Sequence, residues 1–320
     1  MTQQRRDDGS LRHLLTLQDL SRDELEAILE RAQHYVRRRG ELAPRSDVLA
    51  GLTVANLFTE PSTRTRVSFE LAAKRLGADV VNLEVQLSSR VKGESMLDTV
   101  FTLESLHVDV FVIRDAEAGV PALVARHVGP AVSVLSAGEA HVSHPTQGLL
   151  DALTILQHKG RCEPLAVAIV GDIRHSRVAR STCQALQTLG VGELRLVAPP
   201  ALMPAADEFA GCVRHDSLEA GIRNADVVMM LRIQRERFAD ADVPAGDAYF
   251  ARYGLTAGRL ALAHPKAIVM HPQPMNRGVE IDSAVADGPQ SVIRDQVANG
   301  VAVRMAVLET LAAVPAQRRS

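Results

Sequence analysis

Apolar runs of strand length alternate with amphipathic stretches along most of the chain. The apolar runs predict strands at residues 52–58, 78–85, 108–115, 131–138, 165–172, 193–199, 226–232 and 267–272. The amphipathic stretches predict helices at residues 21–39, 64–76, 95–106, 120–128, 147–157, 176–190 and 217–225. Repeated β-α units of this kind favour parallel sheets with helices on both faces. The pattern therefore predicts an α/β fold.

The polar stretch QHKGRCEP, residues 157–164, interrupts this pattern near the middle of the chain. We therefore predict two doubly wound domains, each a mostly parallel sheet flanked by helices. The first covers residues 1–146 and the second covers residues 147–297. A last amphipathic stretch, at about residues 298–314, is expected to pack back onto the first domain.

The helix at residues 64–76 shows the packing that we expect. Its apolar residues recur at helical spacing and are predicted to form the buried side: Val67, Leu71, Phe69, Ala72 and Leu76. Gly77 is expected to end this helix.

Polar residues with useful chemistry follow nearly every predicted strand. In chain order they are Glu60 to Arg66, Arg114, His144, Asp172 to Arg177, Arg232, and His271 with Pro272. Open α/β sheets bind ligands at the carboxyl ends of their strands. We therefore expect the functional residues of both domains at these ends.

The charge balance limits the kinds of partner. The chain has 36 Lys and Arg residues against 38 Asp and Glu residues, so it lacks the overall basic field that nucleic acids or anionic membranes attract. No apolar run reaches the roughly 20 residues of a membrane helix. The polar start MTQQRRDDGS lacks the apolar core of a signal peptide. We expect a cytoplasmic protein that captures small anions locally.

Metal and redox cofactors are not expected. The three cysteines are odd in number and form no C-x-x-C pair: Cys162, Cys183 and Cys212. The 11 histidines show no H-E-x-x-H spacing. The turn at residues 171–176 resembles a dinucleotide-binding turn, but it has Ile173 and Ser176 where that motif needs glycines.

The start of the helix at residue 64 carries two arginines, Arg64 and Arg66. Cations are unfavourable there because a helix start has unpaired N–H groups and partial positive charge. An anion would reverse this, and the hydroxyls around Arg64 could bind it together with the N–H groups. The segment is suited to a small phosphate ester or acyl phosphate.

STRTR at residues 62–66, together with HPTQ at residues 144–147, resembles the carbamoyl-phosphate signature of the aspartate and ornithine carbamoyltransferase family. The likeness continues through SSRVKGES, VIRD, GDIRHSRVARS, LRIQRERF and VMHPQPMNRGVEI, and so covers almost the whole chain. The resemblance implies transfer of a carbamoyl group from carbamoyl phosphate to an amino acid, with L-aspartate the favoured acceptor. It also implies an active site in the cleft between the two domains.

The resemblance assigns one set of residues to carbamoyl phosphate: Ser62, Thr63, Arg64, Thr65, Arg114, His144, Gln147, Pro272 and Gln273. Thr65, Arg114 and His144 would contact the carbonyl oxygen. Gln147 and the Pro272 carbonyl would accept hydrogen bonds from the carbamoyl NH₂. The implied catalytic residues are Arg64, Thr65, Arg114, His144, Gln147 and Lys92.

Arg177 and Arg232 would bind the two carboxylates of aspartate by the same resemblance, with Lys92 and Gln234 beside them. Ornithine has a cationic side chain, which a second arginine would repel. The Ser-Met-Gly loop and the cysteine typical of ornithine enzymes do not occur here. Ornithine or another amino acid as acceptor, and a catalytically silent scaffold subunit, stay open as alternatives.

The resemblance also implies an assembly. Ser88 and Lys92 would reach a neighbouring subunit's site, which makes a homotrimer with shared sites the expected unit. Glu60 is a candidate to pair across the domains with Arg177 or Arg237. HPQPMNRGVEI resembles a branch that assembles with dihydroorotase or a dihydroorotase-like chain. The polar lead MTQQRRDDGSLRH could be that branch's extension or a disordered tail.

Overall fold

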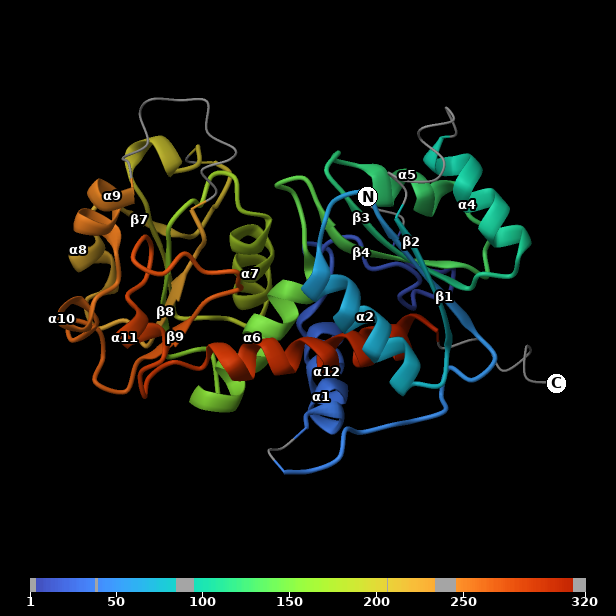
Figure 1. Cartoon of the computed structure of the whole chain (residues 1–320), viewed down its shortest axis with the longest axis horizontal. Helices are drawn as coiled ribbons and strands as arrows, with labels where there is room; N and C mark the ends of the chain where they lie inside the picture. Colours follow the sequence, from blue (N-terminus) through green and yellow to red (C-terminus); the bar gives the residue numbers. More distant parts are fainter. Residues whose placement is uncertain (1–3, 38–39, 85–94, 206, 234–245, 313–320) are drawn as a thin grey trace. The chain divides into compact units, whose positions relative to one another are not determined.

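The computed structural model describes residues 4–37, 40–84, 95–205, 207–233 and 246–312. The chain forms two compact units (Figure 1). Unit 1 contains Met1–Leu149 and Ala298–Ser320, and unit 2 contains Leu150–Val297. Both boundaries fall inside helices, α6 (Pro145–Lys159) and α12 (Ile293–Leu311).

Unit 1 is built on a four-stranded parallel sheet with the strand order β2-β1-β3-β4. Its strands are β1 (Thr53–Phe58), β2 (Asp79–Glu84), β3 (Val110–Asp115) and β4 (Ser133–Glu139). Its helices, besides parts of α6 and α12, are α1 (Arg22–Tyr35), α2 (Thr63–Arg75), α4 (Met96–Ser105) and α5 (Val120–His127). The strand order changes direction between β1 and β3. The α/β prediction with parallel sheets is confirmed.

One side of the unit 1 sheet packs against α4 and α5. Phe111 and Ile113 of β3 lie in this core with Val100 of α4 and Val124 of α5, all fully buried. Helix α4 begins at a capping box in which Ser95 and Asp98 satisfy each other's backbone N–H groups. The strands are apolar on both faces, as expected where a parallel sheet is covered on both sides.

Helix α2 corrects part of the packing prediction. Phe69, Ala72 and Leu76 are fully buried, but Val67 is 44% exposed and Leu71 is 39% exposed. Five apolar positions spread around more of the helix than a single sheet contact can cover. The sheet covers one stripe, and Val67 and Leu71 lie on the flank beside it.

The N-terminal segment, residues 4–14, is ordered and lies along the edge of the unit 1 sheet. Leu14 N donates to the Val134 carbonyl at 2.9 Å, and Ser136 N donates to the Leu14 carbonyl at 2.9 Å. The Gln4 amide oxygen accepts from Thr16 N at 3.0 Å. The alternative of a disordered tail is therefore wrong for these residues.

The C-terminal part of α12 lies against α1 within unit 1 (Figure 1). Tyr35 Oη donates to Glu309 Oε2 at 2.9 Å, and Arg31 Nη1 donates to Thr310 Oγ1 at 2.6 Å. Burial and the Glu309 carboxylate together raise the pKa of Tyr35 to about 12. Arg6 Nη2 donates to the Leu311 carbonyl at 2.9 Å, so the N-terminal segment also contacts the end of α12.

Unit 2 is built on a five-stranded parallel sheet with the strand order β7-β6-β5-β8-β9. Its strands are β5 (Ala166–Val170), β6 (Glu193–Val197), β7 (Val213–His215), β8 (Val227–Met230) and β9 (Ile268–Met270). Besides parts of α6 and α12, its helices are α7 (Arg177–Thr188), η2 (Pro200–Leu202), α8 (Leu218–Ile222), α9 (Gly246–Tyr253), α10 (Ala257–Leu260) and α11 (Ser283–Ala286). Figure 1 shows α7 on one side of these strands and α8 on the other.

The strand order of unit 2 changes direction between β5 and β8. Gly171 follows β5 there with φ of 132°, and a Cβ at this position would lie 2.8 Å from the Leu231 carbonyl oxygen. Only glycine fits this close approach and this backbone conformation. Among the described residues, no helix is long and apolar enough to cross a membrane.

Two of the cysteines, distant in sequence, meet in unit 2. Cys183 of α7 is buried, and its pKa is raised by a hydrogen bond with Cys212 and by burial. Cys212 is only partly buried. The thiols are reduced, and Cys162 is buried separately.

Candidate functional site

The start of α2 in unit 1 lacks the usual means of neutralising a helix N-terminus. Ser62 is the N-cap residue, but its side chain makes no capping hydrogen bond, and the first turn contains no acidic residue. Helix α1, by contrast, has a complete capping box and two acidic residues in its first turn. The first turn of α2 instead holds Arg64 and Arg66, with Arg64 exposed. This is the electrostatic arrangement that an anion stabilises.

Arg114 lies at the carboxyl end of β3 and joins β1 to this helix start. Its Nε and Nη2 donate to Glu60 Oε2 at 3.1 and 3.0 Å. Its Nη1 lies 3.5 Å from Thr65 Oγ1 and 3.4 Å from the Ala137 carbonyl oxygen. The side chains of Arg114 and Glu60 are only 12% and 16% exposed. The ion pair therefore holds the guanidinium beside the start of α2.

The partner of Glu60 was not foreseen from the sequence. In the structure Glu60 pairs with Arg114 of the same unit, and its pairing across the domains with Arg177 or Arg237 when substrate binds stays a prediction. The two residues are 54 positions apart, and only the adjacent carboxyl ends of β1 and β3 bring them together. The sequence does place a carboxylate just after β1 and an arginine at the end of β3, and this is the feature from which the ion pair could be predicted.

His144 and Gln147 lie at the start of α6, after β4. The His144 carbonyl accepts hydrogen bonds from Gln147 N at 2.9 Å and Gly148 N at 3.3 Å, which makes His144 the residue that opens the helix. Both side chains are largely buried, with His144 4% exposed and Gln147 8% exposed. We call Ser62 to Thr65, Arg114, His144 and Gln147 the unit 1 site.

Unit 2 repeats the arrangement of an arginine in the first turn of a helix. Arg177 is the first residue of α7, is 8% exposed, and has no acidic residue beside it in that turn. Ser176 Oγ accepts from Ala179 N at 3.0 Å and caps the helix. Asp172 Oδ1 accepts from His175 N at 3.2 Å and lies 3.0 Å from His175 Nδ1, which fixes the turn between β5 and α7.

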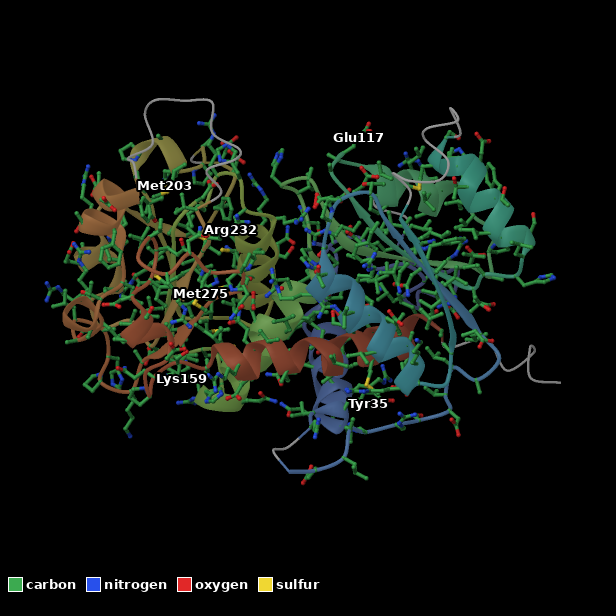
Figure 2. All side chains as sticks on the ribbon, in the orientation of Figure 1. Tyr35, Glu117, Lys159, Met203, Arg232 and Met275 are labelled. Atoms are coloured by element: carbon green, nitrogen blue, oxygen red, sulfur yellow. The ribbon has the colours of Figure 1, made fainter. Side chains whose placement is uncertain are left out.

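Arg232 and the turn after β9 complete the carboxyl edge of unit 2. Arg232 follows β8 and is partly buried, and Figure 2 labels it together with Met275 of the turn. Pro272 and Gln273 follow β9, and both are partly buried. Gln273 has a left-handed backbone with φ of 61°, which is uncommon outside glycine and typical of functional turns. We call Arg177, Arg232, Pro272 and Gln273 the unit 2 site.

Several site residues from the sequence lie outside the described part of the chain: Ser88, Lys92, Gln234 and Arg237.

Asn276 and Glu280, which contact the turn after β9, were not singled out from the sequence. Both lie in VMHPQPMNRGVEI, the segment that carries part of the family resemblance, and a carboxylate and an amide within it were the available signal. Among the described residues, no group of three or more His, Cys, Asp or Glu side chains could hold a metal ion.

The two sites have complementary chemistry. The unit 1 site offers a helix N-terminus, hydroxyls and a fixed guanidinium, a set suited to a phosphate group. The unit 2 site offers arginines that can bind carboxylates in a planar, bidentate way. Part of each set lies at or just after the carboxyl ends of the two strands between which the strand order changes direction, β1 and β3 in unit 1 and β5 and β8 in unit 2, which is the usual ligand position in open α/β sheets.

Comparison with known proteins agrees with this division. Residues 12–157 match the model of the aspartate/ornithine carbamoyltransferase carbamoyl-P binding domain, and residues 163–311 match that of the Asp/Orn binding domain. Aspartate transcarbamoylase from Trypanosoma cruzi, solved with carbamoyl phosphate and aspartate, is 32% identical, with 94% of this chain and 97% of that chain covered and a TM-score of 0.82.

Two ornithine carbamoyltransferases are similar in structure to the same degree. The Thermus thermophilus enzyme is 26% identical, with coverages of 94% and 99% and a TM-score of 0.82. The Pyrococcus furiosus enzyme is 29% identical, with coverages of 95% and 98% and a TM-score of 0.83. The family models cover both units, and the similar solved structures span nearly the whole chain. The chain therefore belongs to the aspartate/ornithine carbamoyltransferase family.

Proposed function

We propose that this carbamoyltransferase uses L-aspartate as its acceptor and forms N-carbamoyl-L-aspartate and phosphate. The observation that carries the proposal is the buried Arg177 at the start of α7, together with Arg232 after β8. Two arginines match the two carboxylates of aspartate. The T. cruzi enzyme that binds aspartate with carbamoyl phosphate has the same fold and is similar in sequence.

Ornithine fits this chemistry less well. Its side chain carries a positive charge, so it would offer one carboxylate to two arginines and bring a cation close to one of them. Like charges at contact distance disfavour binding by several kcal/mol, roughly, in a partly desolvated site. The TM-scores to the two kinds of enzyme are equal, so the fold does not favour either acceptor, and the two arginines are what supports aspartate.

In the proposed reaction, the aspartate amino group attacks the carbamoyl carbon directly. A C–N bond forms, the carbon passes through a tetrahedral intermediate, and the C–O bond to phosphate breaks with its electron pair leaving on phosphate. The amine proton is transferred to the departing phosphate. No side chain becomes covalently attached to the substrate.

The unit 1 site would stabilise the charges of this reaction. Ser62, Thr63 and Arg64 would bind the phosphate at the start of α2. Thr65, Arg114 and His144 would donate hydrogen bonds to the carbonyl oxygen as it becomes negative. The loss of one such donor typically costs roughly 3 to 4 kcal/mol of transition-state stabilisation.

The remaining groups would orient the planar carbamoyl group. Gln147 and the carbonyl of Pro272 would accept hydrogen bonds from its NH₂, with Gln273 beside them. Acceptors on one side and donors on the other would distinguish the NH₂ from the oxygen. Holding both substrates in this orientation converts a reaction between two molecules into one between neighbours.

The experiment offers carbamoyl phosphate with either aspartate or ornithine to the purified protein and measures the carbamoylated product colorimetrically. We expect carbamoyl-aspartate and no citrulline. Citrulline as the main product would overturn the acceptor assignment. If neither product forms, even after mixing with a dihydroorotase-like chain, the silent-subunit alternative holds.

We also propose that the active unit is a homotrimer with shared sites. The exposed Val67 and Leu71 of α2 and the 37% exposed Val81 of the edge strand β2 support self-association of unit 1. Ser88 and Lys92 would enter the neighbouring site. Lys92→Ala and Arg64→Ala proteins should each be inactive, but mixing them should restore activity, because some shared sites then combine an intact Lys92 with an intact Arg64. If sedimentation shows that the fully active protein is a monomer, the proposal is contradicted.

We further propose that the enzyme acts in de novo pyrimidine biosynthesis in the cytoplasm, where carbamoyl-aspartate would be consumed by ring closure. A dihydroorotase or dihydroorotase-like chain is the proposed partner in a larger assembly. Gel filtration of the two chains together should show co-elution. Separate elution over a range of concentrations would count against this partner.

A further inference from the structure

A buried histidine and a buried glutamate accept hydrogen bonds from the backbone of the turn after β9. His271 and Glu280 are both fully buried, at opposite ends of the turn. His271 Nδ1 accepts a hydrogen bond from Gln273 N at 2.9 Å. The neutral ring therefore carries its proton on Nε2, which lies 3.3 Å from Glu280 Oε1.

Glu280 also reaches the middle of the turn, and through it the end of β8. Its Oε1 accepts a hydrogen bond from Asn276 N. The Asn276 side chain donates from Nδ2 to the Ile233 carbonyl at 3.2 Å. Ile233 directly follows Arg232, so these contacts join the turn that contains Pro272 to the backbone beside Arg232.

A second buried chain of hydrogen bonds joins the same turn to α7. Gln296 Oε1 accepts from His271 N at 2.9 Å, and Gln296 Nε2 donates to Asp151 Oδ1 at 2.7 Å. The other oxygen of Asp151 accepts from Thr182 Oγ1 at 2.7 Å. Thr182 lies in α7, the helix that begins at Arg177.

A fully buried carboxylate is expensive to keep away from water unless its contacts are specific. Glu280 Oε1 accepts a hydrogen bond from Asn276 N and lies 3.3 Å from His271 Nε2 without a hydrogen bond to it, so its two contacts fall on either side of Gln273 and its left-handed backbone. None of the apolar side chains within the turn is fully buried: Pro272, Met275 and Val279 are partly buried and Pro274 is exposed. The polar contacts therefore determine where the Pro272 carbonyl and the Arg232 backbone lie relative to each other.

We propose that Glu280 and Asn276 are positioning residues that fix Arg232 and the Pro272 turn in a single arrangement suited to the acceptor. The inference rests on the proposed function of the unit 2 site. Neither residue touches substrate. They act through their contacts with Ile233 and His271. Because the segment after β8 and the turn after β9 are already ordered, less free energy is lost in ordering them when the substrate binds.

The chain supplies a matched control for Asn276. Gln290 Nε2 donates to the Ala267 carbonyl at 2.9 Å, so it also joins a side-chain amide to a backbone carbonyl. Both residues are partly buried. Ala267 precedes β9, whereas Asn276 acts after it, at the carboxyl edge. Gln290→Ala thus removes the same kind of bond from the other end of the same strand.

The experiment measures kcat, both KM values and thermal unfolding for Asn276→Ala, Gln290→Ala, Glu280→Gln and Glu280→Ala. Loss of one such bond is expected to raise the aspartate KM of Asn276→Ala about fivefold to tenfold. Its carbamoyl-phosphate KM should change less than about twofold. Gln290→Ala should leave both KM values unchanged. Glu280→Gln keeps the accepting oxygen and should recover most of the aspartate affinity that Glu280→Ala loses.

An unchanged aspartate KM in Asn276→Ala would overturn the proposal, and so would equal KM increases in Asn276→Ala and Gln290→Ala. Asn276→Ala keeps the test decisive if Glu280→Ala does not fold. Hydrogen exchange of residues 271–280 gives a readout that is independent of the reaction. Faster exchange in Asn276→Ala supports the positioning role even if the wild type rejects aspartate, in which case the proposed function alone has failed.

Discussion

Replacing Arg114 with lysine tests the unit 1 site while the positive charge is kept. The guanidinium donates twice to one oxygen of Glu60 and extends a third nitrogen, Nη1, to within 3.5 Å of Thr65 Oγ1. A lysine ammonium is a single point of charge without this planar fork. It can remain with Glu60 or turn toward Thr65, but it cannot do both.

The expected loss follows from that geometry. Because Glu60 is only 16% exposed, the lysine is expected to stay beside it, which leaves the developing oxyanion without its cationic donor. Removal of one oxyanion donor lowers kcat by about 100-fold to 1,000-fold, or roughly 3 to 4 kcal/mol. The ion pair is retained but one of its two hydrogen bonds is lost, so the free energy of unfolding should fall by no more than about 3 kcal/mol. The aspartate KM should change little.

The assay is steady-state kinetics at saturating concentrations of both substrates, with urea unfolding in parallel. Arg66→Lys is the control, since it makes the same change in the first turn of α2 at a residue outside the assigned site. A kcat for Arg114→Lys within about threefold of wild type would refute the reasoning, because it would mean that charge alone suffices.

Other substitutions separate the two sites and probe the N-terminal segment. Arg64→Ala should abolish turnover by losing phosphate binding, whereas Arg232→Ala should mainly raise the aspartate KM; small and equal effects in steady-state kinetics would contradict both roles. Burial lowers the pKa of His13 to about 3, so the stability present above pH 6.5 is lost as the pH falls toward 3. We expect a loss of roughly 2 kcal/mol between pH 6.5 and 5 in urea unfolding, which His13→Gln should remove. An unchanged pH dependence in that variant would exclude His13. Arg12→Ala loses hydrogen bonds to three backbone carbonyls and should destabilise the protein by about 2 kcal/mol without lowering kcat.

Local pattern was sufficient for the parallel α/β architecture, because strand and helix periods and their alternation are properties of neighbouring residues. The helix predicted at residues 64–76 forms at Thr63–Arg75. The same pattern failed to separate Phe69, which the sheet buries, from Val67, which stays exposed. Periodicity identifies apolar faces, but what covers each face depends on parts of the fold that are distant in sequence.

The site was predictable to the same extent. Residues that follow strands were identified because strand ends are a local feature. Their contacts were not, since Glu60 and Arg114 meet only through the strand order of the sheet. Glu280 escaped notice because a lone glutamate in a loop looks solvated, and only its full burial marks it as unusual.

The N-terminal segment has a consequence for the order of synthesis. Unit 2 is continuous in sequence, so all of its residues have left the ribosome once residue 297 has emerged. Unit 1 also needs residues from 298 onward, and the hydrogen bond from Arg6 Nη2 to the Leu311 carbonyl can form only when Leu311 has been made. During translation, unit 2 can therefore fold before unit 1 is complete, because unit 1 also contains most of α12. A nascent chain paused between these points would hold a complete unit 2 beside an unfinished unit 1, which makes α12 the segment whose arrival completes the molecule.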